Sequence, residues 1–365
     1  MPQALTQLLH DLGVADPGGS GWKVVLFTFF AAAFFTWRFT PRVRDFALKA
    51  GWADEGGGRR VHQGRLPNAG GLAIFAGVVG ALLLAALLRP IVVDDVMIQL
   101  LAILFGGALL VFVGFLDDQY GLSPGFRLMV QSAAALLAYL AGVRIEAAFG
   151  SPLDPLLSLF LTWLWIVGVT NAMNLIDGLD GLAGGIAFIA AVGLLLASAR
   201  YEERAAATLL LAALAGAALG FLRHNLPPSR IIMGDAGAYF FGYTLATAAI
   251  LGYVKVTTVF ALVPVALFLL VPILDTTQVF VRRLVRGQNP LATPGQDHLH
   301  HALFRKGLGQ RRAVFVLWGL TFFTSAVGLF LQGLPAVALV AYALGVGLAL
   351  GFALWRRGLA ERRGR

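Results

Sequence analysis

Apolar segments of about 20 residues recur along almost the whole chain. A helix rises about 1.5 Å per residue and the hydrocarbon layer of a membrane is about 30 Å thick, so this length is typical of membrane-spanning helices. Hydrophobic residues make up 58% of the 365 residues and charged residues only 13%, whereas soluble domains carry about 25% charged residues. The pattern predicts an all-α, polytopic integral membrane protein that folds as a single domain over residues 1–365.

Apolar runs bounded by charged residues, glycine and proline predict about eleven membrane helices, with ten as the alternative. The expected spans are 23–40, 70–88, 97–116, 127–143, 156–172, 183–199, 206–222, 237–252, 256–281, 314–332 and 336–355. Residues 1–22 contain Asp11 and Asp16 but no basic region and no small-residue cleavage site. We therefore expect no cleaved signal peptide and a first span that stays in the membrane.

Lysine and arginine indicate how these spans are oriented. If the N-terminus lies outside and the C-terminus in the cytoplasm, all but six of the 28 lysines and arginines fall on the inner side. Basic residues concentrate on the cytoplasmic side of membrane proteins, so this orientation is expected. The six outer residues are Lys23, Arg89, Arg144, Arg200, Arg204 and Lys255. The cytoplasmic loops, which we expect to form the active site, are then 41–69, 117–126, 173–182, 223–236 and 282–313.

Net charge and cysteine content narrow the classes of function. The net charge is +9, but the basic residues stand in short clusters between the apolar runs rather than in one stripe. Membrane orientation explains such clusters without a nucleic-acid partner. The chain has no cysteine, which excludes disulfides, a thiolate nucleophile and a cysteine-based zinc site.

Two adjacent aspartates, Asp117 and Asp118, open the second inner loop. Carboxylates this close repel one another, so they favour a nearby cation or leave one carboxyl with a raised pKa. Either property suits a general base or a metal site. A hydrated acidic end of a helix is the alternative, and the pair by itself does not decide between them.

The third inner loop carries a polar side chain at every third position: Asn171, Asn174, Asp177 and Asp180. Steps of three residues drift by about 60° around a helix, so the four cannot share one helix face. The glycines between them are expected to break the helix. The two asparagines would then project from the end of a span, with the two aspartates in the turn, towards one hard cation or a sugar phosphate. A capped, hydrated helix end is the weaker alternative, because such groups are costly at a membrane boundary.

Three helices expected to start at the inner face have glycine-rich N-termini, at 68–71, 181–185 and 234–237. Backbone N–H groups and the positive end of the helix dipole make such termini favourable places for phosphate. Asp235, in the third of them, is either part of the chemistry or a simple helix cap. Glycine is frequent in membrane helices. The expected position of all three N-termini on the inner side is therefore more informative than any one of them.

Three of the six histidines, His298, His300 and His301, stand within four residues in the last inner loop. A transition-metal site, a phosphate-binding cluster and a hydrated loop are the alternatives. The carboxylates and amides elsewhere on this face are ligands that Mg²⁺ prefers. We therefore expect the histidines to contact phosphate.

Asp275 is an ionisable residue inside the span 256–281. A charged group at this depth needs a partner. We expect it to contact Arg282 or the active-site loops.

From about residue 60 to 310, the chain resembles the polyprenyl-phosphate N-acetylhexosamine-1-phosphate transferases. Five motifs in order carry the resemblance: 67–71 (PNAGG), 117–131 with its Asp-Asp pair, Gly-Leu-Ser-Pro and Gln131, 171–185, 234–237 (GDAG) and 297–301 (DHLHH). The His-Leu-His-His form is similar to the branch that uses UDP-N-acetylglucosamine. This branch differs from the muramoyl-pentapeptide branch of peptidoglycan synthesis.

The resemblance implies transfer of N-acetylhexosamine 1-phosphate, with N-acetylglucosamine as the expected sugar, from a UDP-sugar to membrane polyprenyl (undecaprenyl) phosphate, releasing UMP. This is the first membrane step of a cell-envelope glycan such as lipopolysaccharide or teichoic acid. It implies Mg²⁺ as the cofactor, with Mn²⁺ as a substitute. It also implies the bacterial plasma membrane with the active site facing the cytoplasm, and leaves a monomer and a homodimer open.

Carried over residue by residue, the resemblance implies three groups of site residues. The expected catalytic residues are Asp117, Asp118 and Asp235, the expected Mg²⁺ ligands are Asn174 and Asp235, and the expected substrate-binding residues are Arg127, Asn171, Asp177, Asp180, His298, His300 and His301. Arg127 stands where the family usually has a lysine. Its fixed guanidinium fork changes the contact expected with the lipid phosphate.

Three rival functions remain open at this point. The first is the phospho-N-acetylmuramoyl-pentapeptide transferase of peptidoglycan synthesis. An ion-coupled transporter predicts charged residues paired deep inside several spans, yet apart from Asp275 the expected spans are nearly free of them. A non-catalytic membrane scaffold leaves the polar clusters unexplained.

Overall fold

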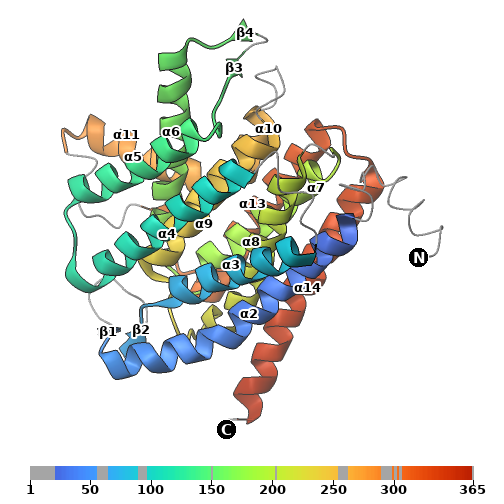
Figure 1. Cartoon of the computed structure of the whole chain (residues 1–365). Helices are drawn as coiled ribbons and strands as arrows, with labels where there is room; N and C mark the ends of the chain where they lie inside the picture. The colour runs from blue at the N-terminus through green and yellow to red at the C-terminus, as the bar shows by residue number, and fades with distance from the viewer. Residues whose placement is uncertain are drawn as a thin grey trace.

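Long helices joined by short turns make up nearly all of the structure, a computed structural model (Figure 1). It describes residues 21–55, 65–88, 97–148, 151–201, 204–253, 262–288, 298–299, 302–303 and 306–363. The helices are α2 Gly21–Ala50, α3 Gly70–Leu88, α4 Met97–Tyr120, α5 Pro124–Leu140, α6 Pro155–Ile176, α7 Leu182–Ser198, α8 Ala205–Asn225, α9 Gly234–Tyr253, α10 Leu262–Phe268, α11 Leu270–Val285, α13 Gln310–Leu331 and α14 Ala336–Arg363.

Two short antiparallel hairpins interrupt the helical pattern at opposite ends of the bundle (Figure 1). Strand β1 (Ala53–Glu55) pairs with β2 (Arg65–Pro67), and β3 (Ala147–Ala148) pairs with β4 (Ser151–Pro152). An isolated parallel bridge joins Asn68 to Ile232, so the chain leaving β2 runs beside the segment that leads into α9. The hairpins are small, and the predicted all-α class is confirmed.

Seven helices of the described structure are long and apolar enough to cross a membrane: α2, α3, α4, α6, α8, α13 and α14. Helix α7 is apolar but shorter. Large apolar side chains remain exposed on the outer helices, as at Phe105 (67%) and Leu348 (73%). A hydrocarbon layer accepts such groups, which water does not. A polytopic membrane protein is therefore confirmed, whereas the count of eleven spans and the orientation remain predictions.

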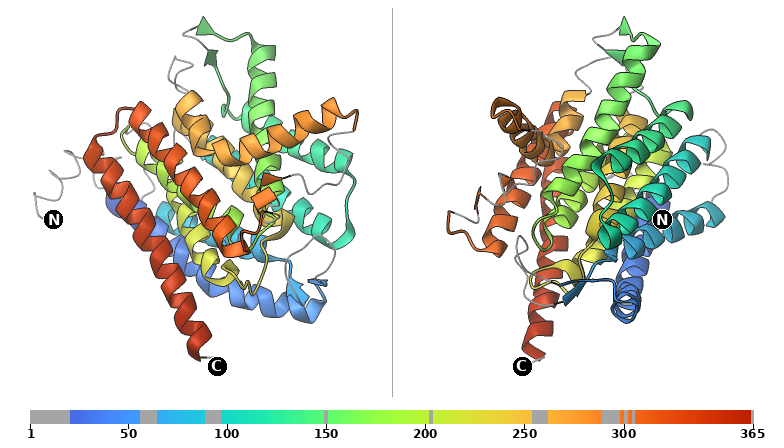
Figure 2. Two further views of the ribbon diagram at one scale, coloured as in Figure 1. Left: turned by 180° about the vertical axis from the view of Figure 1, so that it is seen from behind. Right: turned by 90° about the vertical axis from the view of Figure 1, so that its left-hand side faces the viewer.

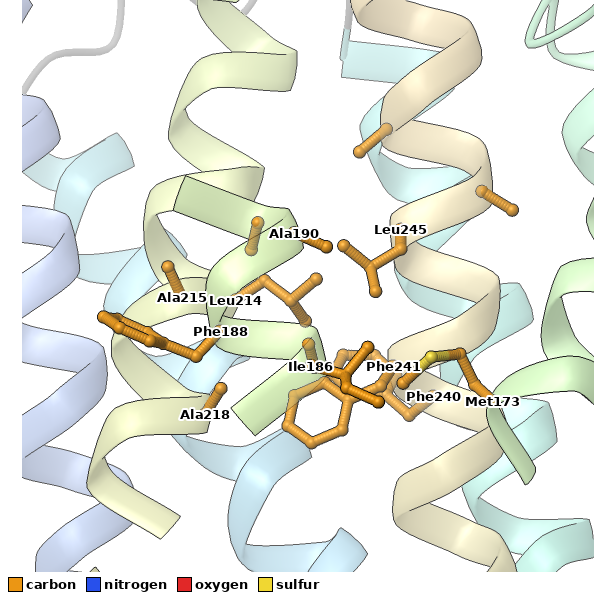
Figure 3. Packing of buried hydrophobic residues seen from close by; sticks show 14 of the residues in the cluster. Met173, Ile186, Phe188, Ala190, Leu214, Ala215, Ala218, Phe240, Phe241 and Leu245 are labelled. Carbon is orange, nitrogen blue, oxygen red and sulfur yellow. The ribbon is translucent and has the colours of Figure 1, made fainter. Parts of the chain in front are cut away.

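Helices α7, α8 and α9 form the centre of the bundle, where Phe188, Leu214 and Phe241 are buried (Figure 3). Helix α8 also lies close against α2. A Cβ added at Gly216 would meet the backbone oxygen of Phe29. Lipid tails are as apolar as leucine, so membrane helices are held together mainly by close packing, which small residues permit.

The helices extend further than predicted, so the inner loops are shorter. Asp117 and Asp118 were expected to open the loop 117–126, but they lie in the last turns of α4. The helix ends where Gly121 takes a positive φ of 67°, and the N–H of Gly121 donates to the carbonyl of Asp117 at 2.9 Å. A glycine in the left-handed region is a common helix stop. Asn171 and Asn174 likewise lie in the final turns of α6, as predicted.

The single span predicted over 256–281 is wrong within the described residues, where the chain forms α10 and α11 with a break at Leu269. Pro272 explains the break, because its ring has no N–H and crowds the carbonyl four residues earlier, at the end of α10. Helix α11 therefore leaves the direction of α10 (Figure 2). Span prediction missed this because the hydrophobicity continues across the break.

Gly216→Ala should destabilise the bundle, because the added Cβ meets backbone of α2 that cannot rotate away. Overpacking of this kind costs about 1–3 kcal/mol. Thermal unfolding in detergent should show a clearly lower Tm for this variant. Gly168→Ala in α6 is the matched control, since nothing lies within 4 Å of its added Cβ. Equal Tm values for the two variants would contradict the close contact of α2 and α8.

Candidate active site

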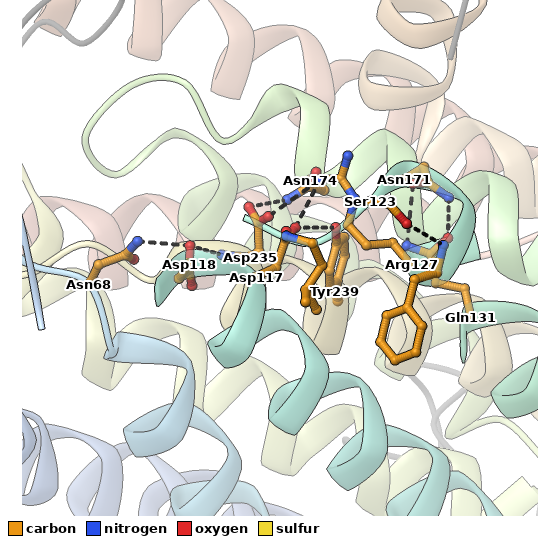
Figure 4. Close-up of polar contacts among 12 residues, drawn as sticks. Asn68, Asp117, Asp118, Ser123, Arg127, Gln131, Asn171, Asn174, Asp235 and Tyr239 are labelled. Carbon is orange, nitrogen blue, oxygen red and sulfur yellow. Dashed lines mark hydrogen bonds and ion pairs between the residues drawn. The ribbon is translucent and has the colours of Figure 1, made fainter. Parts of the chain in front are cut away.

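Residues far apart in the sequence meet at one end of the bundle (Figure 4). They come from the segment after β2, the end of α4, the start of α5, the end of α6 and the start of α9. Hydrogen bonds between side chains join these elements. Four of the five motifs found in the sequence therefore meet in one place.

Glycines allow the helix ends to approach this closely. The N–H groups of Gly70 and Gly71 donate to the carbonyls of Ile232 (3.0 Å) and Met233 (2.9 Å). A Cβ on Gly71 or on Gly114 would collide with the first turn of α9. The prediction of a phosphate site at 68–71 is wrong for these two N–H groups, because the protein backbone already occupies them. The glycines serve close packing instead.

Asp118 fastens three of the elements together. Its Oδ1 accepts from the Asn68 Nδ2 at 2.7 Å and from the backbone N–H of Asp235 at 3.1 Å. Gly234 takes a positive φ of 70° at this point, and a Cβ there would overlap the side-chain oxygens of Asn68 and Asp118. Glycine is thus required at 234 for both the turn and the contact.

Asp117 is the most enclosed carboxylate of this cluster, with its side chain 5% exposed. Its Oδ1 accepts from the N–H of Leu122 at 2.7 Å, and its Oδ2 from Arg127 Nη1 at 2.8 Å. The Tyr239 hydroxyl lies 3.5 Å from the same Oδ2. Arg127 Nη1 is also 3.9 Å from Asp235 Oδ2, so the guanidinium lies between two carboxylates and weakens their repulsion.

Three aspartates meet in this cluster, and the guanidinium of Arg127 lies beside two of them, Asp117 and Asp235 (Figure 4). Asp235 stands two residues before the predicted span 237–252 and therefore lies outside it. Its pKa is raised well above the usual range, because the surrounding protein removes water from the carboxyl and because Asp118 and Asp117 lie beside it. Like charges this close to one another favour a bound cation.

Asn174 and Asp235, the expected metal ligands, are in direct contact: Asn174 Nδ2 donates to Asp235 Oδ1 at 2.8 Å. A half-turn of the amide would present its oxygen beside that of Asp235. Within the described residues, no group of three or more His, Cys, Asp or Glu side chains is arranged to hold a metal ion. Mg²⁺ usually takes one or two carboxylates together with water and substrate phosphates, so the oxygen donors here fit that metal.

Asn171 and Asp180, which were expected to bind substrate, also have partners within the protein. The Asn171 amide pairs with Gln131, with Nδ2 to Oε1 at 2.6 Å and Nε2 to Oδ1 at 3.3 Å. Asp180 Oδ2 accepts from the N–H of Ser229 at 3.1 Å. Asp177 is the residue that ends α6. Asn171 and Asp180 therefore help to hold elements together, and their contacts with substrate remain predictions.

The histidine motif is only partly described, because His300 and His301 lie outside the described residues. His298 is buried, and its Nδ1 lies 2.9 Å from Asp275 Oδ2 on α11. The expected contact of Asp275 with the loop 282–313 is therefore confirmed. The described contacts do not join His298 to the carboxylate cluster.

Three residues of the cluster, Asn68, Gln131 and Tyr239, had no individual role predicted from the sequence. The positions of the last two were foreseeable, because Gln131 stands four residues after Arg127 on α5, and Tyr239 four residues after Asp235 on α9. Residues four apart share a helix face. Asn68 could not be placed in this way, because its contact with Asp118 spans 50 residues of sequence.

Comparison with known proteins agrees with the motifs. The family described as glycosyl transferase family 4 matches residues 100–253. The chain is 36% identical, over 79% of its length and 80% of the relative, to the probable undecaprenyl-phosphate N-acetylglucosaminyl 1-phosphate transferase of Bacillus subtilis. It is 34% identical to the decaprenyl-phosphate N-acetylglucosaminephosphotransferase of Mycolicibacterium smegmatis (84% and 82% covered). It is 28% identical to the undecaprenyl-phosphate alpha-N-acetylglucosaminyl 1-phosphate transferase of Escherichia coli (78% and 77% covered).

The carboxylate cluster predicts stabilisation by Mg²⁺. A ligand that binds only the folded state raises stability by mass action, by about 2.7 kcal/mol at a concentration of 100 Kd. The Tm should therefore rise with added Mg²⁺ and fall back with EDTA. Asp235→Asn should abolish the rise, whereas Asp45→Asn, at an exposed residue of α2, should keep it. A Tm that ignores Mg²⁺ in the unaltered protein would contradict the site.

Proposed function

The chain belongs to glycosyl transferase family 4, and from that membership we propose that it transfers N-acetylglucosamine 1-phosphate to a membrane polyprenyl phosphate. The donor is UDP-N-acetylglucosamine and the second product is UMP. The observation that carries the proposal is the meeting of Asp117, Asp118, Asn174 and Asp235 in one hydrogen-bonded cluster. The relatives' names give the acceptor and the sugar.

Transfer between two phosphates is above all a problem of charge. An oxygen of the lipid phosphate forms a bond to the phosphorus that carries the sugar, the pyrophosphate bond breaks, and UMP leaves. Both reactants are anions, so the site must neutralise charge and align the groups. The second pKa of a phosphomonoester is about 6, so the lipid phosphate is already largely ionised at neutral pH and needs no strong base.

The residues of the cluster divide this task. Arg127 is 30% exposed and is the cation of the cluster that can reach an incoming phosphate, while its contact with Asp117 fixes its direction. Asp118 holds the first turn of α9, and with it Asp235, against Asn68. Asp235 and Asn174 would hold Mg²⁺, which when bound supplies positive charge to the phosphate oxygens of the donor. Asp117 then chiefly orients Arg127 and the acceptor.

Several finer features belong to the same proposal. The cluster faces the cytoplasm of a bacterial plasma membrane, as the distribution of lysine and arginine favours, and the product starts a cell-envelope glycan such as lipopolysaccharide or teichoic acid. The muramoyl-pentapeptide donor is not favoured, since the relatives reported above are named for N-acetylglucosamine. An ion-coupled transporter is not favoured by family membership.

The direct test is a transfer assay with purified protein, undecaprenyl phosphate, Mg²⁺ and separate UDP-sugars. UMP release is expected with UDP-N-acetylglucosamine, less with other UDP-N-acetylhexosamines, and none with UDP-muramoyl-pentapeptide. EDTA should stop the reaction, and Mg²⁺ or Mn²⁺ should restore it. Asp235→Asn is the inactive control. Release of UMP from no donor, with or without EDTA, would overturn the proposal.

Asp117→Asn and Asp118→Asn should each lower turnover by at least about tenfold, within the range that positioned acid, base and charge groups contribute. The variants keep the size of each side chain but remove its charge, so Arg127 loses its ion pair in the first and the Asp118 contact with Asn68 becomes neutral in the second. Steady-state kinetics checks both. Losses of less than tenfold in both variants would exclude a catalytic role for the pair.

A further inference from the structure

Asp275 is a buried acid that the proposed chemistry has not yet used. It lies on α11, where it is 2% exposed. It stands in a buried stripe with Val271, Val279 and Arg283, each one helical turn from the next. The opposite face of α11 is apolar and exposed, as at Leu284. Asp275 is thus on the side of α11 that packs against the protein, which makes its position well fixed.

Both oxygens of this carboxyl group are in hydrogen-bond contact with residues 298 and 299. The backbone N–H of Leu299 donates to Oδ1 at 2.6 Å, and His298 Nδ1 lies 2.9 Å from Oδ2. If the carboxyl group is ionised it can only accept, and the second bond then requires a proton on Nδ1. The contact therefore fixes the direction of the imidazole ring, and Nε2 is its other polar atom.

Helix α11 also packs against α6, the helix that carries Asn174. The break at Leu269 gives α11 its own direction, independent of α10 (Figure 2). Helix α11 therefore contacts His298 and Leu299 through Asp275, and it also packs against α6, which carries Asn174. This arrangement links the position of His298 to the rest of the site through rigid elements.

We propose that Asp275 is a positioning residue for the transfer reaction, holding His298 with Nδ1 protonated so that Nε2 is presented to the diphosphate of the sugar nucleotide. Carboxylates fix the tautomer and orientation of imidazoles in many sites. This inference rests on the proposed function for the identity of the reaction. The contact between Asp275 and His298 does not depend on it.

Asp275→Asn separates positioning from simple anchoring. The amide has the size of the carboxylate and keeps an oxygen for the N–H of Leu299. Its NH₂ group, however, faces Nδ1 of His298 and makes that nitrogen an acceptor, which reverses the tautomer. Turnover should fall by at least about tenfold, with the Tm within a few degrees of the unaltered protein. Asp275→Glu, which keeps the charge, should recover part of the turnover.

Thr276→Val is the matched control on the next residue of α11. The Thr276 hydroxyl is buried and has no hydrogen-bond partner among the described residues. Its loss should leave turnover unchanged. An equal fall in turnover for Thr276→Val and Asp275→Asn would mean that any change in α11 disturbs the site, and would overturn the specific role of Asp275.

A double variant tests whether Asp275 acts through His298. If it does, Asp275→Asn combined with His298→Gln should be no slower than His298→Gln alone, because the second change removes the group that the first one positions. Both single variants should also change the same parameter, kcat or the KM for the UDP-sugar. Losses that multiply in the double variant would contradict the proposal.

The state of His298 can be measured without any turnover. In protein labelled with ¹⁵N-histidine, the His298 resonances are assigned by their absence from His298→Gln, and their shifts report which nitrogen is protonated. A protonated Nδ1 is expected, and an unprotonated Nδ1 overturns the proposal even if Asp275→Asn fails to fold. If no UDP-sugar supports transfer, the proposed function fails, while this measurement still decides the contact.

Discussion

Three carboxylates held together at the edge of a membrane protein are the constraint on which this structure depends. Asp117, Asp118 and Asp235 repel one another, and Arg127 places a compensating charge beside Asp117 and Asp235. Such a cluster is stable only if donors surround it and a cation completes it. Asn68, the first turn of α9 and the N–H of Leu122 supply donors. Their negative charge would attract a divalent cation, and that cation would in turn bind the anionic phosphates.

Close approach of helix ends is what makes the cluster possible. Gly71, Gly114 and Gly234 stand where any side chain would separate α3, α4 and α9 or break the turn before Asp235. The same device joins α2 to α8 in the apolar part of the bundle. Close packing at glycines therefore stabilises this bundle, as the hydrophobic effect stabilises soluble proteins, since apolar side chains gain little by leaving lipid. Glycine thus allows both the polar cluster at one end of the bundle and the close contact of α2 and α8 in its apolar part.

Hydrophobic length and polar spacing were enough to predict the fold class, most helix positions and the residues that converge. Asn171 and Asn174 lie in the last turns of α6 as expected, and that helix ends at Ile176 with Asp177 as its C-cap. The break between α10 and α11 could not be seen in hydrophobicity and depends on Pro272. The contact of Asn68 with Asp118 joins distant parts of the chain, and only the folded structure brings them together. The N–H groups of Gly70 and Gly71 were wrongly predicted to bind phosphate, because their bonds to the segment before α9 also join distant parts of the chain.

The central claim is that Asp235 and Asn174 hold the divalent cation that neutralises the donor phosphates. A structure of the protein with Mn²⁺ and a UDP-sugar, using the anomalous scattering of the metal, tests it most directly. The account predicts one metal peak about 2.2 Å from an Asp235 carboxylate oxygen and from the Asn174 amide oxygen, with the remaining ligands from phosphate and water. A metal peak at other residues, or a bound sugar nucleotide with no metal near Asp235, would contradict it.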